Sequence, residues 1–144
     1  MKPKNMLLDN ALHWSWLVAL VATMGSLYFS EVLHWLPCKL CWYQRILMYP
    51  LVLILGIAAV RKDYRQSIYV LPLSIIGACV SAYHYAMQKT DWLKSASSSC
   101  GPIPCDVDYI NWLGFVTIPL LAFIAFILIT VIHLYIWRNR RKVM

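Results

Sequence analysis

Residues 109–137 read YINWLGFVTIPLLAFIAFILITVIHLYIW and contain no Asp, Glu, Lys or Arg. A helix that crosses a bilayer needs about 20 predominantly apolar residues, so this stretch is long enough to span a membrane. Three more charge-free stretches precede it, at residues 10–30, 46–60 and 66–88. The first and third are long enough alone, and the second becomes long enough when residues 42–45 are added. The sequence therefore predicts four membrane-spanning helices.

The composition excludes a water-soluble domain. Of the 144 residues, 61% are hydrophobic and only 13% are charged, whereas soluble domains average about 45 to 50% apolar and about 25% charged. A soluble fold of this size has one modest core, and the surplus apolar side chains would form large exposed patches. The fold that we expect is all-α, an integral membrane four-helix bundle formed by one domain over residues 1–144. Its expected spans are residues 12–30, 42–60, 67–87 and 112–137, and its expected outward loops are residues 31–41 and 88–111.

The distribution of basic residues predicts the orientation of the chain. With four spans, both termini and the connection at residues 61–65 lie on one side, which carries nine of the 13 Lys and Arg residues. These nine are Lys2, Lys4, Arg61, Lys62, Arg65, Arg138, Arg140, Arg141 and Lys142. By the positive-inside rule this side is cytoplasmic, so the two cysteine-bearing loops are expected to be extracytoplasmic. The net charge of +7 reflects helix ends beside a lipid bilayer, and no nucleic-acid partner is expected.

The first apolar stretch follows Lys2 and Lys4, as the apolar core of a signal peptide follows its basic region. This stretch is longer than the roughly 7 to 15 residues of such a core, and no small-residue cleavage motif ends it. We therefore expect it to be retained as the first membrane helix.

Four of the five cysteines form two pairs in the outward loops, Cys38 with Cys41 and Cys100 with Cys105. Cys79 stands alone in the third span, where a thiol is expected only to pack. A Cys-x-x-Cys bridge closes too short a loop to remove much chain entropy, and such motifs are typical of reactive thiols. We therefore expect the first pair to be redox-active. For the second pair, a disulfide that staples its loop is an open alternative.

Arg45 follows Cys41 by four residues, so its guanidinium lies on the same helical face as the sulfur if a helix begins near Cys41. Both this cation and the helix N-terminus favour a thiolate at Cys41. A charged side chain at the membrane boundary costs free energy, so a structural or functional role is expected for Arg45. Either Arg45 reaches the lipid headgroups, or it forms an electropositive pocket for an anion that develops on a lipid-soluble electron acceptor.

The oxidation of a dithiol releases two electrons, so the protein needs an electron acceptor that takes two. The sequence contains no Cys-x-x-Cys-His haem motif and no Gly-x-Gly-x-x-Gly dinucleotide motif. By elimination, a membrane quinone is the predicted acceptor. The alternative is a membrane scaffold protein that binds metal or is merely stapled by disulfides, since both cysteine pairs fit the spacing of zinc ligands.

The string Pro37-Cys38-x-Leu40-Cys41-x-Tyr43-x-Arg45 in a four-span chain resembles the bacterial DsbB-type thiol:quinone oxidoreductases, and within them the shorter BdbC branch. The resemblance extends to Leu27-Tyr28-Phe29, Tyr83-His84-Tyr85, and Cys105 followed by Asn111-Trp112-Leu113-Gly114 and Pro119. The short interval between Cys100 and Cys105 suits that branch. Gln44 stands where an acidic residue is expected in DsbB.

The resemblance implies an electron route. A reduced thioredoxin-fold thiol oxidase of the DsbA or BdbD kind would attack Cys100, and Cys105 would then exchange with Cys38. Cys41 would pass the electrons to menaquinone or ubiquinone. Which cysteine of the loop pair meets the partner stays open.

The resemblance also implies the quinone contacts, which would be Cys41 and Arg45 with Tyr43 and His84 nearby. The expected activity is that of a disulfide-generating thiol:quinone oxidoreductase of the bacterial cytoplasmic membrane. The related vitamin K epoxide reductase type carries its active Cys-x-x-Cys late in the chain, whereas here the membrane pair comes early.

Overall fold

The structure is a computed structural model that describes residues 3–95, 101–103, 113–114 and 116–143. Its long helices are α1 (Pro3–Leu27), α2 (Lys39–Arg61), α3 (Ser67–Lys89) and α5 (Ile118–Val143). A π-helical turn, η1 (Tyr28–Val32), extends α1, a 3₁₀ turn, η2 (Tyr64–Gln66), precedes α3, and the short helix α4 (Asp91–Lys94) follows it.

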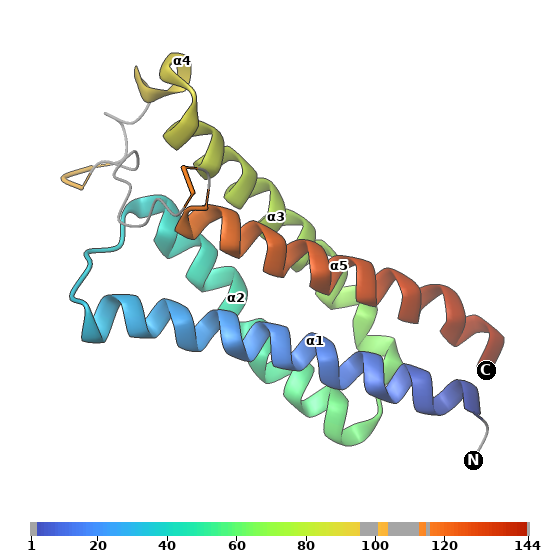
Figure 1. The fold of residues 1–144 in the computed structure, drawn as a ribbon. Coiled ribbons are helices and arrows are strands. Elements are labelled where there is room, and N and C mark those ends of the chain that lie inside the picture. The colour runs from blue at the N-terminus through green and yellow to red at the C-terminus, as the bar shows by residue number, and fades with distance from the viewer. Residues whose placement is uncertain (1–2, 96–100, 104–112, 115, 144) are drawn as a thin grey trace.

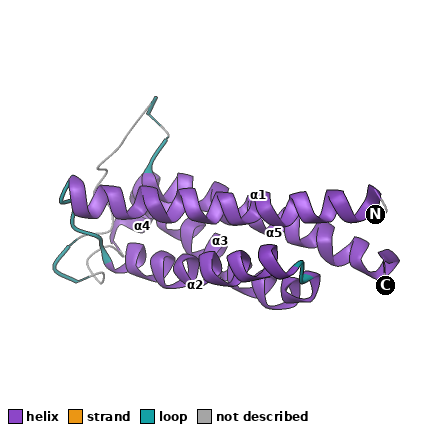
Figure 2. Cartoon of the chain, turned by 90° about the horizontal axis from the view of Figure 1, so that it is seen from below, coloured by secondary structure: helices purple, strands orange, loops and turns teal. Residues whose placement is uncertain are grey.

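The four long helices form an up-and-down bundle (Figure 1). The main contacts join α1 to α2, α2 to α3, α3 to α5 and α5 to α1, so the helices close a ring. Both termini and η2 lie at one end of the bundle, and the segment that precedes α2 lies with α4 at the other end (Figures 1 and 2). All four helices are long and apolar enough to cross a membrane. The predicted all-α membrane four-helix bundle is confirmed.

The surface of the bundle is apolar and its helix contacts are partly polar, as a lipid solvent requires. Large apolar side chains such as Leu53 and Val60 are exposed at 70% and 85%. Small polar side chains are fully buried between helices, namely Ser15, Ser67, Ser74 and Ser81. Lipid tails are as apolar as leucine, so helices associate in membranes through close packing of small residues and interhelical hydrogen bonds. One such bond runs from Thr130 of α5 to Ser74 of α3 at 2.9 Å.

Local chemistry sets the helix ends. Lys62 adopts the left-handed conformation (φ 54°) at the end of α2, and the Tyr64 hydroxyl and the Lys62 ammonium both contact the Asp9 carboxylate of α1. The first three predicted spans fall inside α1 with η1, α2 and α3. The fourth helix begins at Ile118 rather than near residue 112, because Leu113 and Gly114 have positive φ angles of 56° and 80° that a right-handed helix cannot include.

The contact between α3 and α5 depends on a residue without a side chain. A Cβ atom placed on Gly77 would lie 2.2 Å from Cε1 of Phe126, whose side chain is fully buried. Gly77 therefore lets the two helices approach closely around the Phe126 ring. Gly25 is also helical, but a Cβ atom there would meet nothing within 4 Å.

Replacing Gly77 by alanine should destabilise the bundle, because the new methyl group would overlap the fully buried Phe126 ring. Overpacking of this kind costs about 1 to 3 kcal/mol. We expect a lower midpoint of thermal unfolding in detergent for Gly77→Ala, with recovery in the double variant Gly77→Ala/Phe126→Leu. Gly25→Ala is the matched control, and an equal loss in both single variants would contradict the assigned packing.

Candidate active site

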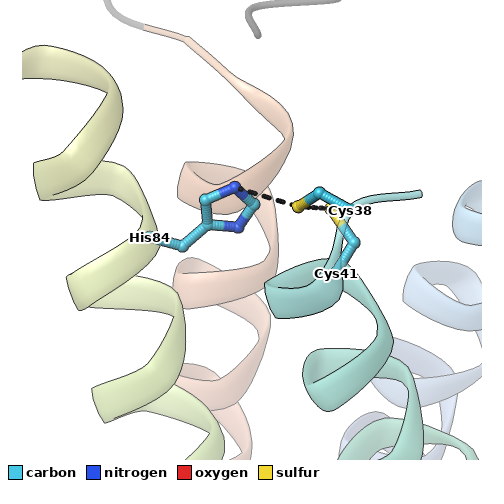
Figure 3. Close-up of side chains that lie close together, drawn as sticks. All are labelled: Cys38, Cys41 and His84. Atoms are coloured by element: carbon cyan, nitrogen blue, oxygen red, sulfur yellow. Dashed lines mark hydrogen bonds between the residues drawn. The ribbon is translucent and has the colours of Figure 1, made fainter. Parts of the chain in front are cut away.

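The first cysteine pair lies where α2 begins, at the end of the bundle away from the termini (Figure 1). Cys38 is the N-cap residue of α2 and is only 6% exposed, while Cys41 lies one turn into the helix and is half-buried. Their sulfur atoms lie 3.2 Å apart, and both are free thiols. The two sulfurs are thus in contact at the start of α2 (Figure 3).

His84 reaches this pair from α3 (Figure 3). Its side chain is 1% exposed, and its Nε2 atom lies 3.7 Å from the sulfur of Cys38. The amide nitrogen of Gln44 lies 3.1 Å from Nδ1 of the same ring. An amide nitrogen only donates, so Nδ1 accepts and the proton of the neutral ring lies on Nε2, directed at Cys38. Gln44 thereby sets which ring nitrogen faces the sulfur.

The surroundings of Cys38 favour its thiolate. Contact with the Cys41 thiol has the largest effect and His84 a smaller one, and together they outweigh burial and lower the pKa of Cys38 from 9.0 to about 4. The N-terminus of α2 adds partial positive charge at the same position. The sequence favoured a thiolate at Cys41, on the assumption that the helix begins near that residue. The helix begins at Lys39 instead, so Cys38 occupies its N-terminus.

The Arg45 side chain is held by contacts with Ser26 of α1 and with Trp42 of its own helix. Its Nε donates to the hydroxyl of Ser26 at 3.0 Å, and its Nη2 donates to the backbone carbonyl of Ser26 at 3.1 Å. Its guanidinium also lies over the ring of Trp42, 5.6 Å from the centroid. These contacts fix a positive charge between α1 and α2, one helical turn below Cys41.

A cavity of about 550 Å³ lies between α1, α2 and α5, and its lining is mainly apolar. Its polar contributions include Cys41, Gln44 and Arg45 of α2. At one end of the lining the rings of Phe29 and Trp35 stack at 5.3 Å and 15°. The volume and the small set of polar groups are typical of ligand pockets.

This cavity is open toward the lipid. Several side chains that line it, on both α1 and α5, are exposed; they include Leu17, Val21, Leu121, Ile124 and Leu128. An opening in the apolar surface of the bundle would admit an apolar molecule from the bilayer.

The structure brings together four of the predicted site residues. Cys41 and Arg45 line the cavity, and Cys38 and His84 meet on the side of the pair that faces α3. Tyr43 is 45% exposed and does not line the cavity, so its role as a quinone contact stays a prediction, as does that of His84. The predicted second pair, Cys100 and Cys105, lies outside the described residues. Cys79, expected to pack, is exposed on α3.

Sequence reasoning missed two functional side chains. Gln44 appeared only as a departure from the family pattern, although a polar residue three positions after Cys41 in an apolar span is a usable signal. Ser26 gave no signal, because its contact with Arg45 arises only when α1 packs against α2.

A multi-pass membrane bundle with a Cys-x-x-Cys pair in contact beside a mainly apolar cavity defines a membrane thiol redox protein. The chain belongs to the DsbB family, because the family model described as "Disulfide bond formation protein DsbB" matches residues 9–136. The predicted family is thus confirmed, and the protein is a disulfide-forming membrane redox protein.

Close relatives carry a consistent name. A Bacillus cereus protein named "Probable disulfide formation protein C 1" is 55% identical over 132 residues, covering 92% of this chain and 95% of the relative. "Disulfide bond formation protein C" of Bacillus subtilis is 58% identical over 120 residues, covering 83% of this chain and 87% of the relative. No solved structure gives a significant match.

The low pKa of Cys38 should be visible in its reaction with a small thiol reagent such as methyl methanethiosulfonate. A lowered pKa means that the thiolate is present above about pH 4 and is lost only as the pH falls through that value. We expect the rate at Cys38, located by fragment masses, to change less than about twofold between pH 6 and 8. An ordinary thiol with a pKa of about 8.5 would gain more than tenfold.

Two variants separate the two causes of the lowered pKa of Cys38. Cys41→Ala removes the largest cause and should move the inflection of the Cys38 rate upward, and His84→Ala should move it upward by less. A tenfold rise between pH 6 and 8 in the unsubstituted protein would contradict the assigned thiolate.

Proposed function

We propose that this protein reoxidises an extracytoplasmic thioredoxin-fold thiol oxidase by thiol–disulfide exchange and passes the electrons to a membrane quinone, menaquinone or ubiquinone. The observation that carries the proposal is the lipid-open cavity whose lining includes both Cys41 and Arg45. A scaffold merely stapled by the first pair is disfavoured, because the surroundings of Cys38 lower its pKa, as is typical of a reactive thiol.

The cavity suits a flat apolar ring with oxygen atoms. Its lining is mainly apolar, and the stacked rings of Phe29 and Trp35 provide a flat aromatic surface at one end. Arg45 holds a fixed positive charge at the lining, where it would favour negative charge on a quinone oxygen. Ser26 keeps that charge in place, since it takes two donors of the guanidinium.

The chemistry of the pair is a two-electron oxidation. When Cys38 and Cys41 join in a disulfide, they release two electrons and two protons, which quinone accepts when bound. Two exchanges then reduce the pair again. The partner's dithiol opens the disulfide between Cys100 and Cys105, and a thiolate of that loop opens the disulfide between Cys38 and Cys41. Each exchange breaks one S–S bond and forms another, so the disulfide made when quinone oxidises Cys38 and Cys41 is passed on to the partner.

The two sulfurs of the membrane pair face different neighbours. Cys38 contacts His84 of α3, while Cys41 lines the cavity. We assign Cys38 to exchange with the loop cysteine, because it begins the helix at the end of the bundle. We assign Cys41 to the quinone side.

The proposed location is the bacterial cytoplasmic membrane with both termini in the cytoplasm. The end of the bundle with the termini and η2 carries most of the Lys and Arg residues, which the positive-inside rule places in the cytoplasm. The cysteine pair lies at the opposite end, where an extracytoplasmic partner can approach.

Arg45→Lys should weaken the use of quinone while leaving the fold intact. Lysine keeps the charge but loses the planar group that donates twice to Ser26, so the charge is no longer fixed at the cavity. We expect kcat/KM for a soluble quinone analogue to fall about tenfold, which corresponds to about 1.4 kcal/mol. Ser26→Ala retains the carbonyl acceptor and should fall less. Unchanged quinone kinetics in Arg45→Lys would remove its assigned role.

Thiol counting tests the electron route directly. Reduced protein in detergent receives quinone without oxygen, and an alkylating agent then traps the remaining thiols for mass measurement. We expect the five adducts of the reduced chain to fall to one, because two disulfides consume four of the five cysteines and leave Cys79.

The other outcomes are equally informative. Three adducts would mean that only one pair is coupled to quinone, and fragment masses would show which. Five adducts would overturn the quinone proposal. Cys41→Ser is the control, in which the membrane pair cannot close and quinone reduction should stop.

A further inference from the structure

Three potential metal ligands converge at the redox end of the bundle. The sulfurs of Cys38 and Cys41 and a ring nitrogen of His84 all lie within 4.8 Å of one another (Figure 3). Cys38 and His84 are buried and Cys41 is half-buried. This group is formed by two helices, since α2 supplies the cysteines and α3 supplies the histidine. It differs from the four-cysteine site that spacing alone suggested, which would require Cys100 and Cys105.

The distances are close to those of a zinc site. With Zn–S bonds of about 2.3 Å and a Zn–N bond of about 2.0 Å, tetrahedral geometry places two sulfurs about 3.8 Å apart and sulfur about 3.5 Å from nitrogen. The two sulfurs here are 3.2 Å apart, and Cys38 is 3.7 Å from Nε2. The two sulfurs would separate by about half an ångström, and the Cys41 sulfur, which lies within 4.8 Å of the histidine nitrogen, would settle about 3.5 Å from it. The fourth position remains for water or an added ligand.

The charge balance also suits a divalent ion. Two thiolates neutralise Zn²⁺, so the occupied site carries no net charge at a buried position, where an unpaired charge is costly. Binding releases the proton of whichever cysteine is still a thiol and moves no electrons. The metal therefore needs both cysteines in the reduced state, because a disulfide has no thiolate to offer.

Gln44 is able to support His84 in both states. Without metal, its amide nitrogen donates to Nδ1. With a metal on Nε2, the ring proton moves to Nδ1, and the Gln44 amide accepts it through its oxygen after turning over. Ligand histidines commonly have such a partner at the second nitrogen. A glutamate at this position would accept from Nδ1 but could not donate to it when ionised.

We propose that the reduced site binds Zn²⁺ through Cys38, Cys41 and His84, and that the bound ion blocks oxidation of the pair. The ion acts as a redox-gated inhibitor, because only the dithiol state holds it and the sulfurs cannot join while they are ligands. Metal binding stands on the three side chains alone, whereas the inhibitory effect rests on the proposed function.

The binding experiment uses the full chain in detergent with Cys79, Cys100 and Cys105 replaced by serine, so that only the membrane pair can supply thiolates. Zn²⁺ is added to reduced protein and to protein oxidised with diamide, and the bound metal is measured after dialysis. We expect one Zn²⁺ per reduced chain and none after oxidation. Binding that survives oxidation would place the ion elsewhere and overturn the site.

His84→Ala tests the third ligand and should weaken Zn²⁺ binding at least tenfold while both thiols remain. His13→Ala is the matched control, since His13 lies on α1 with an exposed side chain whose ring bonds to the Asp9 carbonyl at 2.7 Å. Equal affinities in the two variants would reduce the site to a plain dithiol and overturn the proposal.

X-ray absorption of the zinc form keeps the test independent of how His84→Ala folds. The spectrum of protein that retains His84 should show two sulfurs at about 2.3 Å and the outer-shell scattering of one imidazole. A spectrum without imidazole scattering would overturn the assignment.

Quinone reduction is measured separately on protein with all its cysteines. Saturating Zn²⁺ should stop it, and a chelator should restore it. Unimpaired reduction by the zinc form would overturn the blocking role. Failure of the metal-free protein to reduce quinone would instead overturn the proposed function and leave the binding result intact.

Discussion

The residue at which α2 begins determines the geometry of the redox end. Pro37 and the extended backbone of Cys38 start the helix at Lys39, so one cysteine caps the helix and the other lies one turn inside it. The sulfurs consequently touch yet have different surroundings, with His84 of α3 beside Cys38 and the cavity beside Cys41. A helix start one residue later would remove Cys38 from the N-cap position.

The rest of the bundle holds those neighbours in place. Lipid gives no hydrophobic force between helices, so α1, α2, α3 and α5 associate through small residues, close packing and interhelical hydrogen bonds. Gly77 admits the Phe126 ring, and the Thr130–Ser74 bond joins the same two helices. Gln44 with His84 and Arg45 with Ser26 then tie α2 to its two neighbours, one on each side.

The sequence predicted the features that depend on local composition, and it missed those that depend on contacts between helices. Charge-free stretches predicted the four helices, and the Cys-x-x-Cys-x-Tyr-x-Arg string predicted the family. The start of α5 was misplaced, since a charge-free run does not reveal where Leu113 and Gly114 leave helical geometry. The contribution of His84 to the thiolate at Cys38 and the Arg45–Ser26 contact arise only from the packed bundle, because His84 and Ser26 are distant in sequence from their partners.

Because the cavity between α1, α2 and α5 lies within the apolar part of the bundle, its occupancy depends on the concentration of a ligand in the lipid phase. A molecule that enters from the bilayer is present as moles per mole of lipid, and its aqueous concentration matters only through partitioning. Diluting the protein with buffer at constant lipid-to-protein ratio leaves occupancy unchanged, whereas adding lipid or detergent lowers it. Affinities for this cavity are therefore comparable only when they are expressed as mole fractions in the apolar phase.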